Sequence, residues 1–430
     1  MKITLNKNRN NVYKYLTASL LTYLALTTAI FAAEQSIHGI IDTRLITVDG
    51  AKNSSSYLLG GYGKFDNKYD SAATLAQLGI SYKASWQNNF SINIVANAFS
   101  NKKKDNIGIT EAFIHYKGLP NSSGWRLQGK AGFFYPTISL ENNAVAWSNP
   151  NTLNNSTLNT WVAEELRNTG VQVTVEKLGK FTRSKHDFSL NLSLFQNNDT
   201  AGAMLTWHGW TSGTRQSLFQ EKLKLQPFPA RQQGKPLAIQ APYSDPFLEL
   251  DNRWGAHIVA QWKVKNKQHP LKINLGYYNN NTASSIEIKG QYTWKTRFVH
   301  AGFKTKLAKK LTLLGQYMHG NTYMKGKYGG FAVNANFTSA FIMLRKYWQK
   351  HQIALRIEEF SVDDLDNTWG DNNQEYGKGL TLSYRYRLSK NNFIQSEYNW
   401  LQSNRPARWY VKQPIDLIER QLQLAFRVYF

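Results

Sequence analysis

The last ten residues, 421–430, read QLQLAFRVYF and alternate between two kinds of side chain. One face is apolar and holds Leu422, Leu424, Phe426, Val428 and Phe430. The opposite face is mostly polar and holds Gln421, Gln423, Ala425, Arg427 and Tyr429. A period of two predicts a β-strand that lies between an apolar and a polar environment. Terminal residues are usually frayed and polar. These terminal residues are instead alternating and apolar on one face, so we expect this strand to stay structured up to Phe430.

This ending resembles that of Gram-negative outer-membrane β-barrel proteins, whose closing strand ends in phenylalanine. The resemblance implies that Phe430 is an assembly signal read by the barrel-assembly machinery. It also implies localisation in the cell outer membrane, among lipid and lipopolysaccharide, after export through the periplasm.

The N-terminus has the features of a secretory signal peptide. Four basic residues precede an apolar stretch over residues 15–31, and Ala32 and Ala33 supply small side chains for cleavage. We therefore expect residues 1–33 to be a signal peptide and residues 34–430 to form the barrel. A single N-terminal membrane anchor is the alternative.

The composition narrows the class of protein. The chain has no cysteine, which excludes disulfide scaffolds and thiolate catalysis. No run of 18 apolar residues follows residue 34, which excludes a bundle of transmembrane helices but not a barrel, since half of each barrel strand faces a polar interior. The net charge of +24 is spread singly through the expected strands. This distribution favours a charged lumen over a nucleic-acid partner, for which the chain has no basic tail or known motif.

Sixteen segments alternate with a period of two and have the length of tilted membrane strands. They lie near 36–47, 77–86, 90–98, 109–117, 125–133, 170–178, 187–197, 255–264, 271–279, 291–305, 311–319, 335–345, 351–361, 377–388, 392–402 and 417–430. Short turns alternate with long connections at 48–75, 100–108, 135–169, 198–254, 280–290, 320–334, 362–376 and 403–416. The pattern predicts an all-β protein, a transmembrane antiparallel β-barrel of sixteen strands, with eighteen as the alternative count.

In such a barrel the short turns face the periplasm and the long loops are extracellular. Residues 203–210 also alternate, and we place them inside the long loop 198–254. Aromatic residues cluster beside the short turns, as in an interfacial girdle: Trp86, Phe90, Tyr116, Trp125, Phe188, Trp262, Tyr386 and Phe430. A soluble β-sandwich or propeller is the alternative, but the loop rhythm and the girdle favour the barrel.

Two segments resemble the region from strand five to loop three of the phosphate-selective porin-like superfamily. They are FFYP at 133–136 and WVAEELRNTG at 161–170. The resemblance implies an outer-membrane porin, a water-filled channel that is often a homotrimer and passes anions. Loop three lacks the dense ladder of arginine and lysine that phosphate selectivity suggests, so phosphate is a doubtful substrate.

Loop three of a porin folds into the lumen and narrows it, and residues 135–169 occupy that place here. We expect a short helix from Ser156 to Arg167 with Ser156 as its N-cap. The residues expected at the constriction are Trp161, Glu164, Glu165 and Arg167. A loop that only caps the barrel mouth is the alternative.

If leucine, isoleucine and tryptophan face lipid, the basic residues between them face inward, and basic rings favour anions. The residues expected to line the pore and attract anions are Arg44, Lys83, Lys117, Arg126, Lys130, Lys263, Arg356, Arg385, Arg387 and Arg427, with Lys272 and Lys304 in the same pattern. Inward acids are fewer: Asp42, Glu111, Glu176, Glu358 and Glu397. The alternative for each of them is that it pairs with an opposite charge and stiffens the wall, without any role in attracting anions.

The sequence gives no sign of catalysis or of a cofactor. It lacks a Gly-x-Ser-x-Gly motif, a phosphate-binding glycine loop and a His-Glu-x-x-His motif, and its nine histidines are scattered. We therefore expect no enzyme, no cofactor and no metal. One acidic loop is a weak candidate for Ca²⁺, but its carboxylates have no fixed ligand spacing: Asp363, Asp364, Asp366, Asp371 and Glu375.

Passive diffusion of small hydrophilic solutes, with anion preference, is the function this pattern favours. A second hypothesis is selective uptake of an organic anion such as a carboxylate, with Arg126 and Lys130 as its binders. A third is a non-channel barrel whose long loops bind a partner or a surface. The third rests on the aromatic residues of loop 198–254, which include Trp207, Trp210, Phe219, Phe228, Tyr243 and Phe247.

Overall fold

The computed structural model describes residues 33–50, 55–66, 71–100, 106–283, 285–326 and 329–430. The predicted signal peptide, residues 1–33, lies outside the described residues except for Ala33. In the described part of the chain, no helix is both long enough and apolar enough to cross a membrane.

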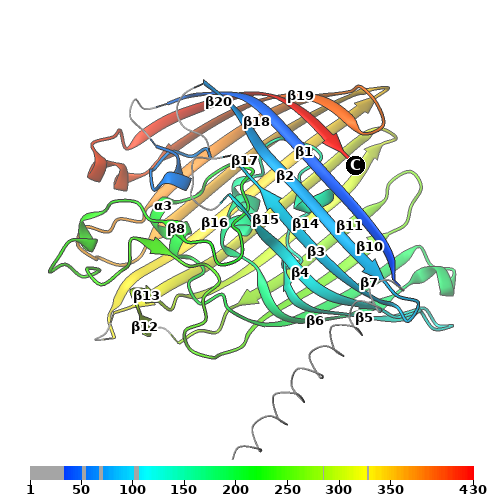
Figure 1. Ribbon diagram of the computed structural model, residues 1–430, viewed down its shortest axis with the longest axis horizontal. Helices are drawn as coiled ribbons and strands as arrows, with labels where there is room; N and C mark the ends of the chain where they lie inside the picture. Colours follow the sequence, from blue (N-terminus) through cyan, green and yellow to red (C-terminus); the bar gives the residue numbers. More distant parts are fainter. Residues whose placement is uncertain (1–32, 51–54, 67–70, 101–105, 284, 327–328) are drawn as a thin grey trace, which may run out of the picture.

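Sixteen strands of the described chain form one closed barrel, as predicted (Figure 1). Each strand pairs antiparallel with the next, and β1 pairs with β20 to close the wall. The strands are β1 Glu34–Asp49, β2 Ser71–Ser85, β3 Phe90–Ala98, β4 Ile107–Lys117, β5 Trp125–Phe134, β6 Asn168–Lys177, β7 His186–Gln196, β10 Gly255–Val264, β11 Leu271–Asn279, β14 Lys295–Ala308, β15 Leu311–Lys325, β16 Phe331–Trp348, β17 His351–Asp364, β18 Glu375–Arg387, β19 Asn392–Asn404 and β20 Asp416–Tyr429. Each predicted segment overlaps one of them.

Successive side chains of β20 point alternately to the outside and to the inside of the barrel. Leu422 is 59% exposed on the outside, whereas its neighbours Gln421 and Gln423 are buried inside. The same contrast separates Phe426 from Arg427. The predicted directions of the two faces are therefore correct for this strand.

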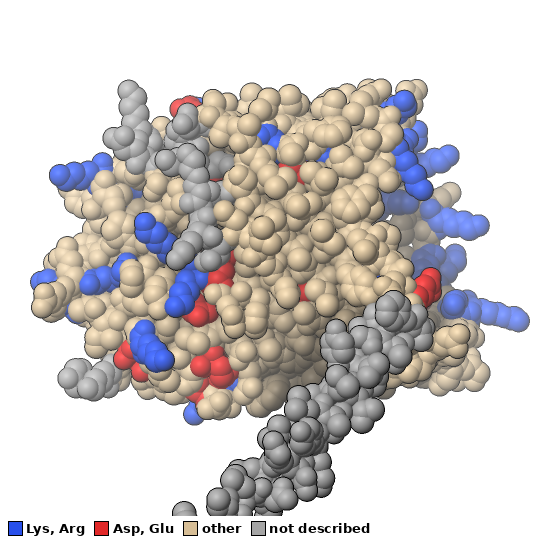
Figure 2. All heavy atoms as spheres, in the orientation of Figure 1, with Lys and Arg blue, Asp and Glu red and all other residues tan. Residues whose placement is uncertain are grey.

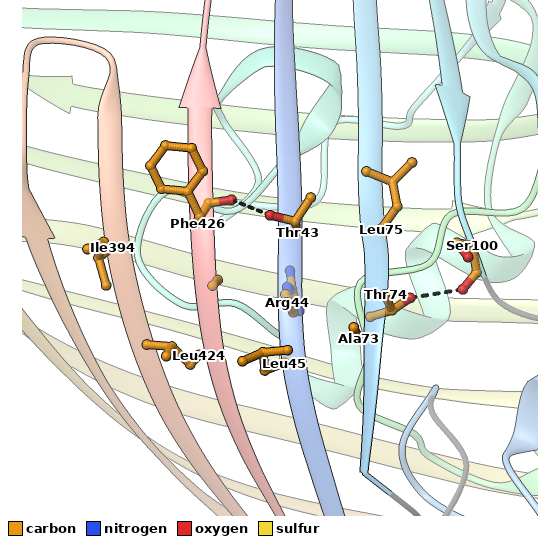
Figure 3. Close-up of a pocket in the computed structure, with 11 residues that line it drawn as sticks. Thr43, Arg44, Leu45, Ala73, Thr74, Leu75, Ser100, Ile394, Leu424 and Phe426 are labelled. Carbon is orange, nitrogen blue, oxygen red and sulfur yellow. Dashed lines mark hydrogen bonds between the residues drawn. The ribbon is translucent and has the colours of Figure 1, made fainter.

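The seam between β1 and β20 closes the barrel. In its register Asp42 faces Arg427 and Leu45 faces Leu424. Figure 3 shows the seam from outside, where the Thr43 hydroxyl donates to the carbonyl oxygen of Phe426 at 3.4 Å. Apolar side chains border a shallow groove here, while Arg44 projects to the other side of the wall.

Aromatic rings gather on the outer face near the short turns. Phe90 packs on Tyr116 with 5.0 Å between ring centroids, and Phe188 stacks on Trp262 at 6.4 Å. Trp125 is half exposed. Amphipathic rings favour the edge of an apolar layer, so this arrangement matches the predicted girdle.

The long connections meet at the other end of the barrel (Figure 1). They carry helix α2, Thr157–Glu165, helix α3, Ala203–His208, and two small hairpins, β8 Leu223–Lys224 with β9 Tyr243–Ser244 and β12 Glu287–Ile288 with β13 Gln291–Tyr292.

Residues 203–210 lie in the long loop and outside the wall, as predicted, and residues 203–208 of this segment form helix α3. Two other sequence expectations need correction in these connections. Residues 291–292 were predicted to begin a wall strand and form β13 instead. The connection predicted at 320–334 is shorter in the structure and consists of the residues between Lys325 and Phe331. The reason is that β15 and β16 remain paired through most of the predicted loop.

An apolar cluster fills part of the barrel interior. Leu158, Trp161 and Val162 of α2 pack against inward rings of the wall, among them Phe298 and Phe337. The inner face is therefore apolar where the helix covers it, and a smaller apolar cluster joins Leu140 of loop three to inward residues of β15, β16 and β17. The simple assignment of an entirely polar interior is wrong on this side of the wall, because packing against α2 replaces contact with water.

Candidate functional site

Loop three, the connection between β5 and β6, lies inside the barrel. Its tip contacts inward side chains of β1, β17, β18, β19 and β20, which form the opposite side of the wall. Almost every residue from 148 to 168 is buried. The predicted entry of this loop into the lumen agrees with these contacts.

The helix of loop three begins where the sequence predicts. Ser156 caps α2, and its hydroxyl accepts a hydrogen bond from the Asn159 amide at 3.2 Å. Glu141 accepts bonds from both the amide and the hydroxyl of Ser156 at 2.7 Å. A serine N-cap satisfies an amide that the helix itself cannot. The helix ends at Glu165, two residues before the predicted end.

Wall carboxylates hold the backbone of the loop. Glu397 of β19 accepts bonds from the amides of Leu153 and Asn154, the second at 2.9 Å. Glu358 of β17 accepts a bond from the Thr157 amide at 2.7 Å. Charged acceptors make stronger hydrogen bonds than neutral ones. These acids therefore fix the position of loop three and are not free charges of a pore.

Three predicted wall arginines are paired and buried. Arg44 and Arg427 both bind Asp42, at 2.6 and 3.1 Å. Arg356 binds Glu358 at 3.3 Å and Glu141 at 3.4 Å. These three arginines therefore pair with acids of the wall and of loop three, as the alternative to an anion-attracting role predicts.

The arginines also donate to backbone carbonyls of the loop tip. Arg427 reaches the carbonyl of Asn149 at 2.9 Å, and Arg385 reaches that of Pro150 at 2.7 Å. Arg44 and Arg356 reach the carbonyls of Leu153, Asn154 and Asn155. The wall thus grips the tip through both its amides and its carbonyls.

The four residues expected at the constriction lie on the part of loop three that contacts the 198–254 loop. Trp161 is 2% exposed, and its indole donates to Glu165 at 2.6 Å. Glu165 accepts bonds from the amides of Gly202, Met204 and Leu205 at the start of α3. Glu164 contacts His208 at 3.0 Å. Burial raises the pKa of the Glu165 carboxyl to about 7, and the nearby Glu164 charge adds to the shift.

Arg167, the fourth expected constriction residue, is buried in an aromatic cage. Its guanidinium lies 4.2 Å from the ring centroid of Tyr135 and 5.3 Å from that of Phe247. It donates to the Ala163 carbonyl at 3.0 Å and to the Tyr135 hydroxyl. Burial lowers the pKa of Arg167. These contacts give all four residues a packing position, and their part in a constriction stays a prediction.

The aromatic residues of the 198–254 loop are mostly internal. Trp207, Trp210, Phe228 and Phe247 are buried, whereas Phe219 is 43% exposed. Trp207 packs on Trp294 and Phe228 in a second apolar cluster. Internal packing therefore accounts for the aromatic content that motivated the partner-binding hypothesis.

The remaining predicted basic residues differ in their surroundings. Arg126 binds Glu176 at 2.5 Å, while Lys130 lies 4.9 Å from the ring centroid of Phe113. The side chains of three others are exposed near the short turns: Lys83, Lys117 and Arg387.

Lysines face one another on three neighbouring strands. In the register of the wall Lys263 of β10 stands opposite Lys272 of β11, which stands opposite Lys304 of β14. All three are partly buried, and no ion pair joins them to a carboxylate among the described residues. The three lysines line a cavity together with Arg345, which sequence reasoning missed. Its inward position in the β16 alternation is the signal that would have found it.

The carboxylates of the acidic loop, the weak candidate for a calcium site, have separate hydrogen-bond and ion-pair partners. Asp366 accepts the amides of Asn334 and Thr368, and Asp364 accepts that of Asn373. Glu375 binds Lys64 and lies 3.8 Å from Arg405. Burial raises the pKa of Asp371 to about 7. Each carboxylate is thus oriented by its own donors.

No protein-family model and no curated protein matches the chain. Solved structures match it over most of its length. A loop-deletion mutant of OmpT, an outer membrane protein of Vibrio cholerae, is 8% identical, with a TM-score of 0.51 over 93% of this chain and all of that one.

Two further structures match to the same extent. The outer membrane channel DcaP of Acinetobacter baumannii is 11% identical, with a TM-score of 0.51 over 93% of this chain and 98% of that one. OmpF of Salmonella typhi is 9% identical, with a TM-score of 0.50 over the same shares. At these identities the likeness concerns the fold alone: the chain has the closed β-barrel fold of these outer-membrane proteins.

Proposed function

We propose that this protein is an outer-membrane porin, a channel for passive diffusion of small hydrophilic solutes with a preference for anions. Its fold is shared with proteins of the outer membrane, one of them described as a channel. Its outer face is apolar, as a barrel in lipid requires. It is not an enzyme in this proposal, and it needs no cofactor.

The observation that carries the anion preference is the difference between paired and unpaired inward charges. Among the acids of the inner wall, Asp42 and Glu358 are paired with arginines, and Glu397 accepts hydrogen bonds from loop amides. The lysines of β10, β11 and β14 form no ion pair with a carboxylate among the described residues. Unbalanced lumen charge sets the sign of ion selectivity.

Loop three supplies the size limit in this proposal. It is held by wall groups from several strands, so it forms a stiff obstacle inside the barrel. Arg126 and Lys130 lie on the strand that leads into it. The organic-anion hypothesis assigns these two residues to solute binding, although Arg126 is already paired with Glu176.

The lengths of the connections set the orientation of the barrel in the membrane in this proposal. The short turns lie at the periplasmic rim, and the long loops face outward with the lipopolysaccharide. Assembly as a homotrimer and recognition of Phe430 by the barrel-assembly machinery complete the proposal.

The test is a reversal potential in a planar bilayer under a salt gradient. We expect an anion-selective potential for the native protein and a shift toward cations for Lys263→Glu. The matched control is Lys346→Glu, because Lys346 lies at the same end of the barrel but is exposed between Leu311 and Ile353. A silent or cation-selective native protein contradicts the proposal.

A further inference from the structure

Three lysines form a ladder on the inner wall near the short turns. Lys263, Lys272 and Lys304 occupy directly opposed positions on three consecutive strands. Opposed residues of an antiparallel pair have their Cβ atoms about 5 Å apart. The flexible stems let the three ammonium groups move apart only by the length of a side chain. Neighbouring groups therefore repel each other.

This arrangement costs stability. Like charges in directly opposed positions destabilise a sheet. Three arginines of the inner wall differ in this respect, because Arg44, Arg356 and Arg427 each have a carboxylate within 3.4 Å. In the described wall the ladder brings three cations into register, and Asp187, which stands opposite Lys263 on β7, is paired with Lys265 instead.

The ladder borders a cavity of about 310 Å³. Arg345 lines it as well and donates to the Thr312 hydroxyl at 3.2 Å and to the Asn151 side chain at 2.7 Å. The Nε atom of Arg345 is buried without a hydrogen-bond partner. A guanidinium presents a fork to oxyanions, whereas lysine supplies point charges on a flexible stem.

We propose that the cavity between Lys263, Lys272, Lys304 and Arg345 binds a small multivalent oxyanion. One negative charge cannot satisfy four cations, whereas an anion of two or three charges contacts several of them together and removes their repulsion. A volume of this size is at the lower end of small-ligand sites. The inference goes beyond the proposed function, because binding at equilibrium needs no ion flux.

Charge at this end of the molecule favours the approach of such an anion. Figure 2 shows lysine and arginine side chains at the end of the barrel opposite α3 and β8, with few acids beside them. A surface of one sign raises the local concentration of counter-ions. The cavity lies at this end, since Lys265, Pro270 and Lys306 also line it.

The experiment compares sulfate and citrate with chloride at equal ionic strength, using the full-length protein in detergent without phospholipid. Thermal unfolding and calorimetric titration are measured for the native chain and for Lys272→Met, which removes the central charge and keeps the stem. The control is Lys346→Met on the outer face at the same end.

Two opposite changes are expected for Lys272→Met. Without a multivalent anion the variant melts at a higher temperature than the native protein, because the repulsion is gone. With sulfate or citrate the native protein gains more stability than the variant, and the variant binds about tenfold more weakly. Lys346→Met behaves as the native chain in both tests.

The proposal is overturned if sulfate and citrate stabilise the native protein no more than chloride does. It is also overturned if Lys272→Met and Lys346→Met lose binding equally, since that result describes general surface charge. Neither outcome affects the proposed channel, which is judged by its reversal potential. A cation-selective channel that still binds sulfate through the ladder would contradict the proposed function alone.

Discussion

The ring of Phe430 lies directly over the α-carbon of Gly39. A Cβ atom added to Gly39 would fall 2.1 Å from the Cζ atom of Phe430, which is far too close for two carbon atoms. The backbones of the two residues exchange hydrogen bonds of 2.8 and 3.1 Å. A glycine thus gives the terminal aromatic ring its place on the first strand, next to the closing seam.

Gly39→Ala is expected to weaken closure of the barrel. The new methyl group must displace the Phe430 ring, and overpacking of this kind costs about 1–3 kcal/mol. The native-like fraction of the refolded protein should fall, as measured by the mobility difference between heated and unheated samples in SDS gels.

Gly129→Ala is the matched control for this prediction. A Cβ at Gly129 meets only the carbonyl oxygen of Gln172, at 3.9 Å, so the substitution has room. Equal loss of folded protein in both variants would show that glycine flexibility, not the fit of the Phe430 ring, matters at Gly39.

Glu165 is expected to make the contact between α2 and α3 depend on pH. Its pKa is about 7 when the two helices are docked, above the usual value near 4.5, because burial disfavours the charged form. A raised carboxyl pKa means that docking is most stable at low pH and loses stability as pH rises from about 4.5 through 7. The loss is of the order of 3 kcal/mol, at about 1.4 kcal/mol per pKa unit.

Hydrogen exchange of the Met204 and Leu205 amides measures this change. After correction for intrinsic rates, protection should be lower at pH 8 than at pH 5 in the native protein and nearly constant in Glu165→Gln. Glu164 and His208 face the same contact and are unchanged in Glu165→Gln, so the comparison isolates the Glu165 carboxyl. Glu359→Gln, at an exposed wall position, should keep the native pH profile.

Arg356→Met is expected to destabilise the protein strongly. The substitution leaves Glu141 and Glu358 without their cation in a buried setting. Breaking a buried ion pair from one side costs about 3–5 kcal/mol. The midpoint of denaturant unfolding should fall accordingly.

Arg420→Met removes an ion pair of similar length on the exposed surface, 3.2 Å from Asp49. Such pairs contribute about 0–1 kcal/mol. If the two variants unfold at the same denaturant concentration, Arg356 does not brace loop three in the way its contacts suggest.

Local patterns predicted the wall and the start of the loop-three helix, but not the partners of the charges. The alternation around Arg427 is enough to point this residue inward, and Ser156 is a recognisable cap within its own segment. The partner of Arg427 is Asp42 at the other end of the chain, brought close only by closure of the barrel. Trp161 could be assigned to a loop helix, but its burial depends on Trp210 in the next long loop.

Glu397 is expected to control the mobility of the loop-three tip. Its carboxylate accepts bonds from the Leu153 and Asn154 amides, and bonds to a charged group contribute about 1.5–3 kcal/mol each. Glu397→Ala should therefore release the tip and speed hydrogen exchange at both amides. Glu397→Gln keeps an acceptor oxygen and should have a smaller effect.

If loop three limits the channel, the same release should change conduction. We expect larger and noisier single-channel currents from Glu397→Ala than from Glu397→Gln. Fast exchange at Leu153 and Asn154 with unchanged current would mean that this part of the loop does not narrow the path. Unchanged exchange in Glu397→Ala would mean that the carbonyl contacts of Arg44, Arg385 and Arg427 hold the tip without it.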